Sequence, residues 1–185
     1  MTESIRVYIE KVSGPSLVRK ALSFSYGICS NMPSRKLFDV GHTIERLCLY
    51  AVYLGNIPTE VSVHLVRHSQ TGQFHLVKSH REDWTGSLPE EVTRKTPVNH
   101  FMMLNARHFK DISNVRLCNK ALGKTRLVWK KVIEELAKVE PDLAGECVPQ
   151  CYRCGYCVER DKQCVTFRSN EAMIWRKKKG GCLYG

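Results

Sequence analysis

The sequence predicts one α+β domain, built on a central mixed or antiparallel sheet with flanking helices. Three observations predict it: a dense apolar run at residues 47–54, helix signals directly after that run, and the longest helical periodicity later, at residues 119–139. Strands followed by helices, with one short helix between the first strands, are typical of this class. The 185 residues, 43% of them hydrophobic, suffice for one ordinary core.

The first strand is expected at Leu47–Leu54, which is dense in β-branched, aromatic and aliphatic residues. The pair Gly55-Asn56 follows it and is expected to end it. Pro58 suits a first helical turn, and the acidic residue two positions later favours the N-terminal end of the helix dipole. A short helix is therefore predicted at residues 59–68.

The remaining elements follow from spacing and breakers. A second strand is expected at residues 73–79, a polar connection from Glu82 to Arg94, and a short helix from Asn105 to Asn114. Apolar residues recur at helical spacing over residues 119–139, so this helix is expected to be the most regular and to stop before Pro141. Its apolar positions are Leu122, Thr125, Trp129, Val132, Ile133, Leu136 and Val139.

Charge and hydropathy restrict the setting and the partners. No apolar run approaches the ~20 residues that a membrane span requires, and the first residues lack a secretory segment, so we expect a cytoplasmic protein without a membrane partner. The net charge of +11 predicts an anionic partner, either nucleic acid or a phosphorylated small molecule such as a nucleotide, a dinucleotide or a polyglutamylated folate. The basic run Arg176–Lys179 is interpreted as a solvated tail.

Nine cysteines in a cytosolic chain indicate metal binding or redox sensitivity rather than a secreted disulfide framework. Three of them, Cys29, Cys48 and Cys118, have apolar neighbours and are expected to be small core residues. Further along the chain, two Cys-x-x-Cys motifs overlap at Cys154, and four thiolates in this region would suit zinc. The cysteines concerned are Cys147, Cys151, Cys154, Cys157 and Cys164. Their spacing is tighter than that of two separated Cys pairs, so zinc binding stays open. Bound zinc together with the basic tail would favour a zinc-dependent nucleic-acid-binding module.

Three segments share an order with a known family. The first runs without a gap from Gly41-His42 to Arg67-His68-Ser69 and leads to Ser79-His80-Arg81; the second joins Leu104-Asn105-Ala106-Arg107 to Val115-Arg116-Leu117-Cys118 and Ala121; the third holds Ala144-Gly145, Cys147, Gly155-Tyr156-Cys157 and Cys164. Together they cover about half the chain. They resemble the flavin-dependent thymidylate synthase (ThyX) family, which carries Gly-His, Arg-His-Arg and Ser-x-Arg elements in this order.

Four departures mark the chain as a divergent, shortened relative. Ser69 replaces the last Arg of the signature, Val77 stands where the family has an acidic or amide residue, and Glu82 replaces the usual Tyr. The segment between Arg81 and Asn105 is also shorter than is typical of the family. The loss of a cation at position 69 is expected to weaken flavin binding.

The resemblance implies an enzyme of thymidylate biosynthesis. Family members reduce FAD with NADPH, take a one-carbon unit from methylenetetrahydrofolate and deliver it to C5 of dUMP, with active sites at the subunit interfaces of a homotetramer. On this reading residues 1–146 form the catalytic domain and residues 147–185 a Cys-rich basic tail. Two alternatives stay open: a relative with altered or lost nucleotide chemistry, and the zinc-dependent module.

The resemblance also assigns roles in the nucleotide site. Arg116 and Ser79 are the expected catalytic residues, because developing charge on the pyrimidine ring calls for fixed donors and a guanidinium. Ser79 and Arg81 would hold the phosphate, with Arg94 as a second partner, and His64 takes the place of a family Gln. The full substrate-binding set is His64, Arg67, Ser79, Arg81, Arg94 and Arg116. Arg116 could also be an ordinary surface residue.

A second set of positions corresponds to FAD contacts. It comprises Ser23, His42, Arg67, His68, Asn105, Arg107 and Asp111. Asn105 could equally be only a helix N-cap, and His68 only the end of the preceding helix. Ser23 matches only with a gap in the alignment. Lys78 is the nearest substitute for the cation missing at position 69.

Overall fold

A four-stranded antiparallel sheet forms the centre of the molecule. The computed structural model describes residues 4–27, 31–40, 43–68, 74–77, 93–161 and 163–180. The sheet order is β1-β2-β4-β3, and every neighbouring pair is antiparallel. The strands are β1 (Arg6–Lys11), β2 (Leu49–Pro58), β3 (Phe74–Val77) and β4 (Pro97–Asn105). The predicted α+β class with an antiparallel sheet is confirmed.

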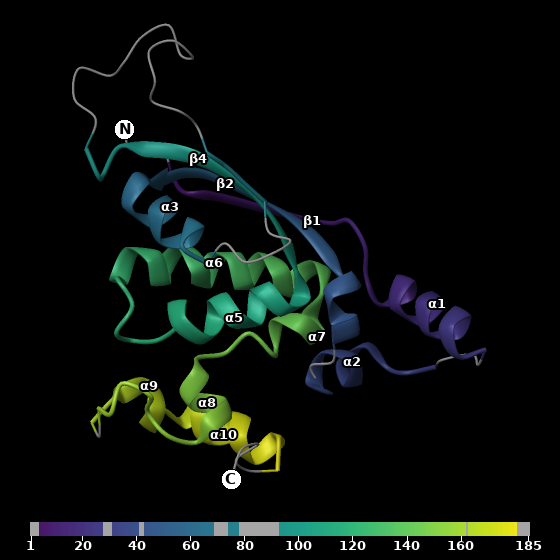
Figure 1. The fold of residues 1–185 in the computed structure, drawn as a ribbon. Helices are drawn as coiled ribbons and strands as arrows, with labels where there is room; N and C mark the ends of the chain where they lie inside the picture. Colours follow the sequence, from purple (N-terminus) through teal and green to yellow (C-terminus); the bar gives the residue numbers. More distant parts are fainter. Residues whose placement is uncertain are drawn as a thin grey trace, which may run out of the picture.

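Three helices cover one face of this sheet (Figure 1). They are α3 (Thr59–Val66), α5 (Ala106–Arg116) and α6 (Gly123–Val139). Alternate residues of β2 point into the core, so Tyr50, Val52 and Leu54 are buried while Tyr53 faces outward. Trp129 of α6 is fully buried, and its indole N–H donates to Ser113 Oγ at 2.9 Å. The predicted amphipathic helix thus supplies one of the largest side chains of the core.

The strand β2 does not end where the sequence predicted. It passes through Gly55-Asn56 and continues to Pro58, with a register shift against β4 between Leu54 and Ile57. Asn56 takes a left-handed conformation with φ 57°, and its backbone N–H donates to Asn99 Oδ1 at 3.3 Å. The turn-forming pair therefore produces an irregularity inside the strand rather than its end.

The predicted helices are present with shifted ends. α3 stops at Val66, and Arg67 and His68 form the turn after it, where a cation is favoured. α5 extends to Arg116 rather than Asn114. α6 begins at Gly123 rather than at residue 119, because the residues before it form a turn closed by Ala121 N–H on Cys118 O at 3.1 Å.

Several elements had no counterpart in the prediction: β1, β4 and the helices of the N-terminal part. The latter are α1 (Pro15–Tyr26), α2 (Ser34–Val40) and the 3-10 helix η1 (Thr43–Leu47). η1 is held by a buried ion pair between Glu45 and Lys110 of α5, and the Lys110 ammonium also donates to Phe38 O at 3.0 Å. Cys48, which follows η1, is fully buried as predicted. Cys118 is only half-buried, and Cys29 lies outside the described residues.

The C-terminal part forms a separate small cluster of helices below the main body (Figure 1). Its helices are α8 (Gln150–Cys154), α9 (Val165–Arg168) and α10 (Asn170–Lys178), connected to α6 through α7 (Pro141–Ala144). The buried side chains of Val148, Cys151, Tyr152 and Ala172 make up its own apolar core. None of the described helices is long and apolar enough to cross a membrane.

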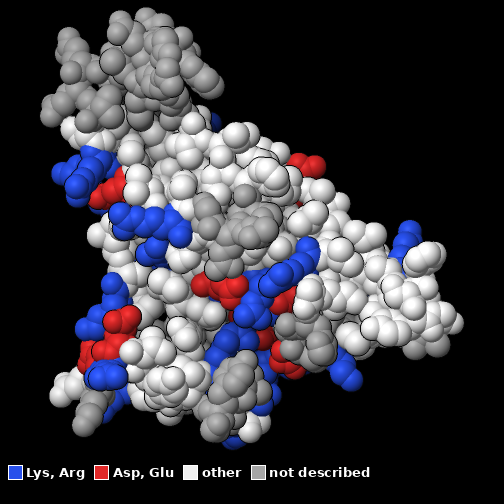
Figure 2. Space-filling view, in the orientation of Figure 1, with Lys and Arg blue, Asp and Glu red and all other residues white. Residues whose placement is uncertain are grey.

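The basic run at residues 176–179 is not simply a solvated tail. Arg176 donates to Cys151 O at 3.0 Å and to Phe167 O at 3.2 Å, and Lys179 pairs with Asp39 and Glu146 at 2.5 Å each. These contacts tie α10 to the rest of the chain, whereas the two lysines between them are exposed. On the face shown in Figure 2, basic and acidic side chains are interspersed over the lower half of the molecule.

Candidate functional site

The ends of α3 and α5 meet at Arg116, the predicted catalytic residue. Its Nε donates to His68 Nε2 at 2.7 Å, and its Nη2 donates to the carbonyl oxygen of His64 at 2.9 Å. Arg116 therefore lies together with two predicted site residues that are 48 and 52 positions earlier in the sequence. The Arg116 side chain is partly buried and joins α5 to α3, so it is not an isolated surface residue, and its role in the site stays a prediction.

The surroundings of this junction disfavour the charged form of both histidines. Burial, reinforced by the Arg116 cation, lowers the pKa of His68 to about 4. Burial and the same cation also lower the pKa of His64 below its ordinary value. Neutral His68 accepts the Arg116 N–H at Nε2, so its ring proton resides on Nδ1.

Arg116 carries its charge next to another cation. Burial and, to a smaller extent, the nearby Arg67 lower the pKa of the Arg116 guanidinium, which stays charged at neutral pH. Within the described residues, both acceptors found for Arg116 are uncharged. Two guanidinium groups that repel each other, one of them partly buried, form a site that an anion would stabilise.

α6 adds a residue that the sequence did not assign to the site. Thr125 is fully buried, and its Oγ1 lies 3.1 Å from His64 Nδ1. This contact fixes the imidazole of His64 against α6. The sequence placed Thr125 on the apolar side of that helix but gave no sign that its hydroxyl would face a histidine 61 positions earlier.

Asn105 begins α5 as an N-cap. Its side-chain oxygen accepts from His108 N–H at 3.0 Å, and His108 Nδ1 accepts from Asn105 N–H at 3.3 Å, a reciprocal capping box. On the exposed side of the same helix, Arg107 and Asp111 form an i,i+4 ion pair with Nε 3.1 Å from Oδ1. Three of the predicted flavin contacts thus share the first turns of α5.

Other predicted residues lie elsewhere or outside the described residues. Arg94 is exposed at the opposite end of α3, where its carbonyl accepts the Glu60 N–H at 3.0 Å. Ser23 lies on α1, far from α3 in the single chain (Figure 1). The structure therefore does not bring Arg94 or Ser23 to Arg116. Outside the described residues lie His42, Ser69, Lys78, Ser79 and Arg81.

A buried chain of polar side chains under α3 was not predicted. Ser62 Oγ lies 3.0 Å from His100 Nδ1, and His100 Nε2 lies 2.9 Å from His75 Nδ1. Burial, and to a smaller extent His75, lowers the pKa of His100 to about 4. β4 was not predicted from the sequence. A strand there would have placed His100 on the inward face, next to the other polar side chains of this row.

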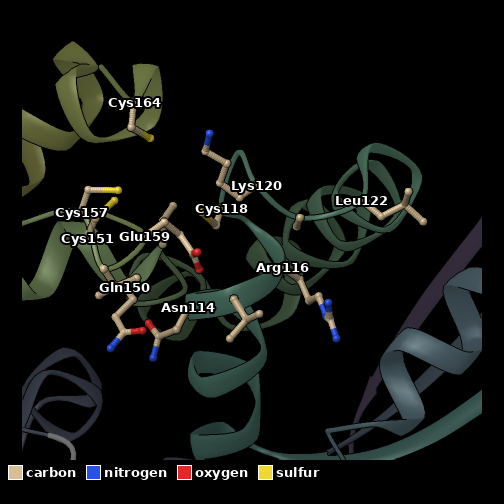
Figure 3. A pocket seen from close by; sticks show the side chains of 14 residues that line it. Asn114, Arg116, Cys118, Lys120, Leu122, Gln150, Cys151, Cys157, Glu159 and Cys164 are labelled. Atoms are coloured by element: carbon tan, nitrogen blue, oxygen red, sulfur yellow. The ribbon is translucent and has the colours of Figure 1, made fainter. Parts of the chain in front are cut away.

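The five cysteines for which zinc stayed open are not grouped as a metal site in the described residues. All five are described, yet no three His, Cys, Asp or Glu side chains in the described part of the chain are placed to hold a metal ion together. Cys147 belongs to the main core, where burial raises its pKa to about 12. Three of the others, Cys151, Cys157 and Cys164, line a cavity together with Cys118 (Figure 3).

Comparison with known proteins identifies relatives by sequence. No family model matches the chain. A flavin-dependent thymidylate synthase from Pyrococcus furiosus is 36% identical over 86 residues, which are 44% of this chain and 34% of the relative. The enzyme of the same name from Pyrococcus horikoshii is 35% identical over the same shares. The chain thus matches about a third of the length of these relatives.

Solved structures share the fold. Thymidylate synthase X (ThyX) from Helicobacter pylori, solved with FAD and dUMP, has a TM-score of 0.63 at 13% identity, covering 78% of this chain and 99% of its own. PolB from Streptomyces cacaoi, a UMP/dUMP methylase bound with 5-Br dUMP, has a TM-score of 0.60 at 12% identity, covering 78% and 94%. The chain is similar in sequence to flavin-dependent thymidylate synthases over 44% of its length, and it shares the fold of the solved ThyX structure.

Proposed function

We propose that this chain is an FAD-dependent enzyme that transfers a one-carbon unit to C5 of dUMP, with methylenetetrahydrofolate as donor and NADPH as reductant. The observation that carries the proposal is Arg116, a partly buried cation held by the uncharged His68 and by a backbone carbonyl, with Arg67 beside it. An anionic ligand would balance both cations. The names of the similar structures, which specify dUMP or 5-Br dUMP, agree with a pyrimidine nucleotide there.

The role of Arg116 follows from its geometry. A guanidinium whose Nε and one Nη2 hydrogen are engaged still has further N–H groups to offer a pyrimidine edge or a phosphate. Because His68 and the α3 carbonyl fix it in place, it can stabilise negative charge on the ring without reorganising. His64, anchored on Thr125, is the second group positioned to bind the base.

The residues present fit a flavin in part. Arg67 and Arg107 are exposed cations, suited to a pyrophosphate, and Asp111, the ion-pair partner of Arg107, lies near His68. Asn105 Oδ1 caps α5, so its amide nitrogen is the atom that would reach the cofactor. FAD, when bound, supplies the hydride that completes the transfer. The contribution of His42 lies outside the described residues.

The proposal extends to the organisation of the protein. Residues 1–146 would form the catalytic domain and residues 147–185 a basic, Cys-rich tail, acting in the cytoplasm as part of a homotetramer. Two apolar clusters support the division, since Cys147 ends the main core and Val148 begins the second one. An assembly would also let Ser23 or Arg94 of one chain approach the site of another.

Nucleotide binding by an Arg116 variant tests the proposal. Calorimetric titration of FAD-loaded protein with dUMP should show that Arg116→Ala weakens binding by roughly one to two decades, the value of one charge-assisted contact. Arg116→Lys should recover only part of this loss, because its ammonium keeps the charge but lacks the planar fork that serves His68, the His64 carbonyl and the nucleotide at once. Arg126→Ala, which removes a side chain of α6 that bonds Asn119 in the described part of the chain, should bind as the wild type does. Unchanged affinity in a folded Arg116→Ala protein would refute the role of the site.

A further inference from the structure

A buried ion pair joins three elements beside the first turns of α5. The Lys110 ammonium pairs with the Glu45 carboxylate of η1 and donates to Phe38 O of α2 at 3.0 Å. Glu45 is 1% exposed and Lys110 is 4% exposed. The Ala106 N–H donates to Cys48 O at 3.0 Å, so the end of η1 is bound to α5 at a second point. The proposed nucleotide chemistry uses neither member of the ion pair.

This ion pair is a poor source of stability. Glu45 Oε1 is buried and has no hydrogen-bond partner in the described part of the chain. Burial raises the pKa of Glu45, although Lys110 acts in the opposite direction. Apolar side chains of similar volume in place of a buried ion pair are often neutral or stabilising. Stability alone therefore does not explain Glu45 and Lys110, whereas the fixed direction of their hydrogen bonds restricts how the three elements lie against one another.

The elements that Lys110 holds carry residues that the resemblance assigns to the flavin. On α5, Lys110 is turned inward, while Arg107 and Asp111 form their ion pair on the exposed side of the helix. Both of these charges act on the Glu45 carboxylate, so the buried pair lies close to them. The other two elements, α2 and η1, stand before and after His42 in the sequence, and His42 itself lies outside the described residues.

We propose that Glu45 and Lys110 are positioning residues of the flavin site: they hold α2 and η1 against α5, so that FAD meets a surface that is already in its binding geometry. The inference rests on the proposed function, because it requires that FAD binds along α5. Both side chains are buried, so they act without touching the cofactor. They act through the backbone of η1 and through the turns of α5 that carry Arg107 and Asp111.

Variants that separate stability from cofactor affinity test this role in the full chain. Glu45→Leu combined with Lys110→Met replaces the ion pair by apolar side chains of similar volume. We expect it to keep near wild-type stability in urea but to bind FAD more weakly by about tenfold or more in flavin fluorescence titrations. Glu45→Gln keeps an oxygen that accepts from Lys110 but leaves the ammonium without its counter-charge, so it should lose stability and yet bind FAD nearly as the wild type does. A pair with a merely structural role would make affinity follow stability in both variants.

A matched control and a second measurement complete the test. Glu135→Leu combined with Lys138→Met makes the same substitutions in an exposed ion pair of α6 and should leave stability and affinity unchanged. Without FAD, the amide hydrogens of residues 43–48 should exchange faster in the Glu45→Leu, Lys110→Met protein, while those of β2 keep their wild-type rates. Unchanged exchange there, or wild-type FAD affinity in this folded variant, would overturn the inference and leave the proposed function standing. A wild-type protein that binds no FAD would overturn the proposed function and the inference with it.

Discussion

Buried histidines are expected to make the stability of the fold depend on pH. His100 is buried at 1% exposure between Ser62 and His75, and its pKa falls from 6.5 to about 4 because burial disfavours the imidazolium. A histidine with a lowered pKa in the folded state binds its proton more readily when the chain unfolds. The stability it contributes is therefore complete above about pH 6.5 and is lost as the pH falls toward 4.

We expect the free energy of unfolding to decrease between neutral pH and about pH 4.5. The contribution of His100 to the slope is at most about 1.4 kcal/mol per pH unit. Urea titrations at a series of pH values measure it. His100→Asn should lower the stability at neutral pH and flatten the slope; a variant with the wild-type slope would show that His100 is not the titrating group.

Ser69 stands where the family has an Arg, and this substitution bears on flavin affinity. Ser69→Arg is expected to restore one charge-assisted contact, worth roughly 1.5–3 kcal/mol, and so to tighten FAD binding by about one to two decades. Lys78→Ala should loosen it if Lys78 fills the gap. Flavin fluorescence titrations measure both. Ser16→Arg adds the same charge on the exposed side of α1 and should change nothing. An equal or weaker affinity in Ser69→Arg would mean that the cofactor pocket has been rebuilt around Arg67.

At the scale of elements, α5 depends on its first residue for both stability and ligand binding. Asn105→Ala removes the acceptor for His108 N–H and should cost about 1 kcal/mol in the free energy of unfolding. Asn105→Asp keeps the cap but replaces the amide N–H₂ with a carboxylate oxygen. We expect it to retain near wild-type stability in urea while weakening FAD in fluorescence titrations. If both properties stay at wild-type values in Asn105→Asp, capping is the sole role of the residue.

The elements that could be predicted have a strong periodic signal of their own. β2 and α6 carry long apolar patterns, and both were located to within a few residues. β4 was missed because Asn99 and His100 interrupt its apolar run, and the sheet neighbours that compensate for them are invisible in sequence. The short helices α8 and α9 depend on tertiary contacts rather than propensity.

The sequence indicated which residues meet at the candidate site, but not how they contact one another. The matched segments singled out His64, His68 and Arg116, which the fold brings together. The direct contact of Arg116 with His68, across 48 positions, depends on how α3 and α5 pack, and so does the part played by Thr125. The same packing separates Arg94 from them, because α3 extends between the two ends.

At the scale of the molecule, the sheet face opposite the helices carries exposed apolar side chains. Tyr8, Tyr53 and Phe101 stack across three strands with ring centroids 5.6 and 5.1 Å apart. Phe74 and Leu76 on β3 are 67% and 69% exposed. An apolar face of this kind is typical of an interaction surface and agrees with the proposed homotetramer.

Light scattering should therefore report an assembly of chains rather than a monomer. Tyr8→Glu places a charge on that face and should shift the population toward smaller species. Leu127→Glu, at a 61% exposed position of α6 away from the sheet, is the matched control and should leave the mass unchanged. A monomeric wild-type protein would contradict the assembly.

The most direct measurement of the central claim is tritium release from dUMP labelled at C5. With FAD, NADPH and methylenetetrahydrofolate present, we expect tritium release. The release should stop when any of the three is omitted, and Arg116→Ala should abolish it while the fold is kept. Purified protein should also show flavin absorbance. A folded, colourless protein that releases no tritium with all components, and binds no dUMP, would contradict the proposed function.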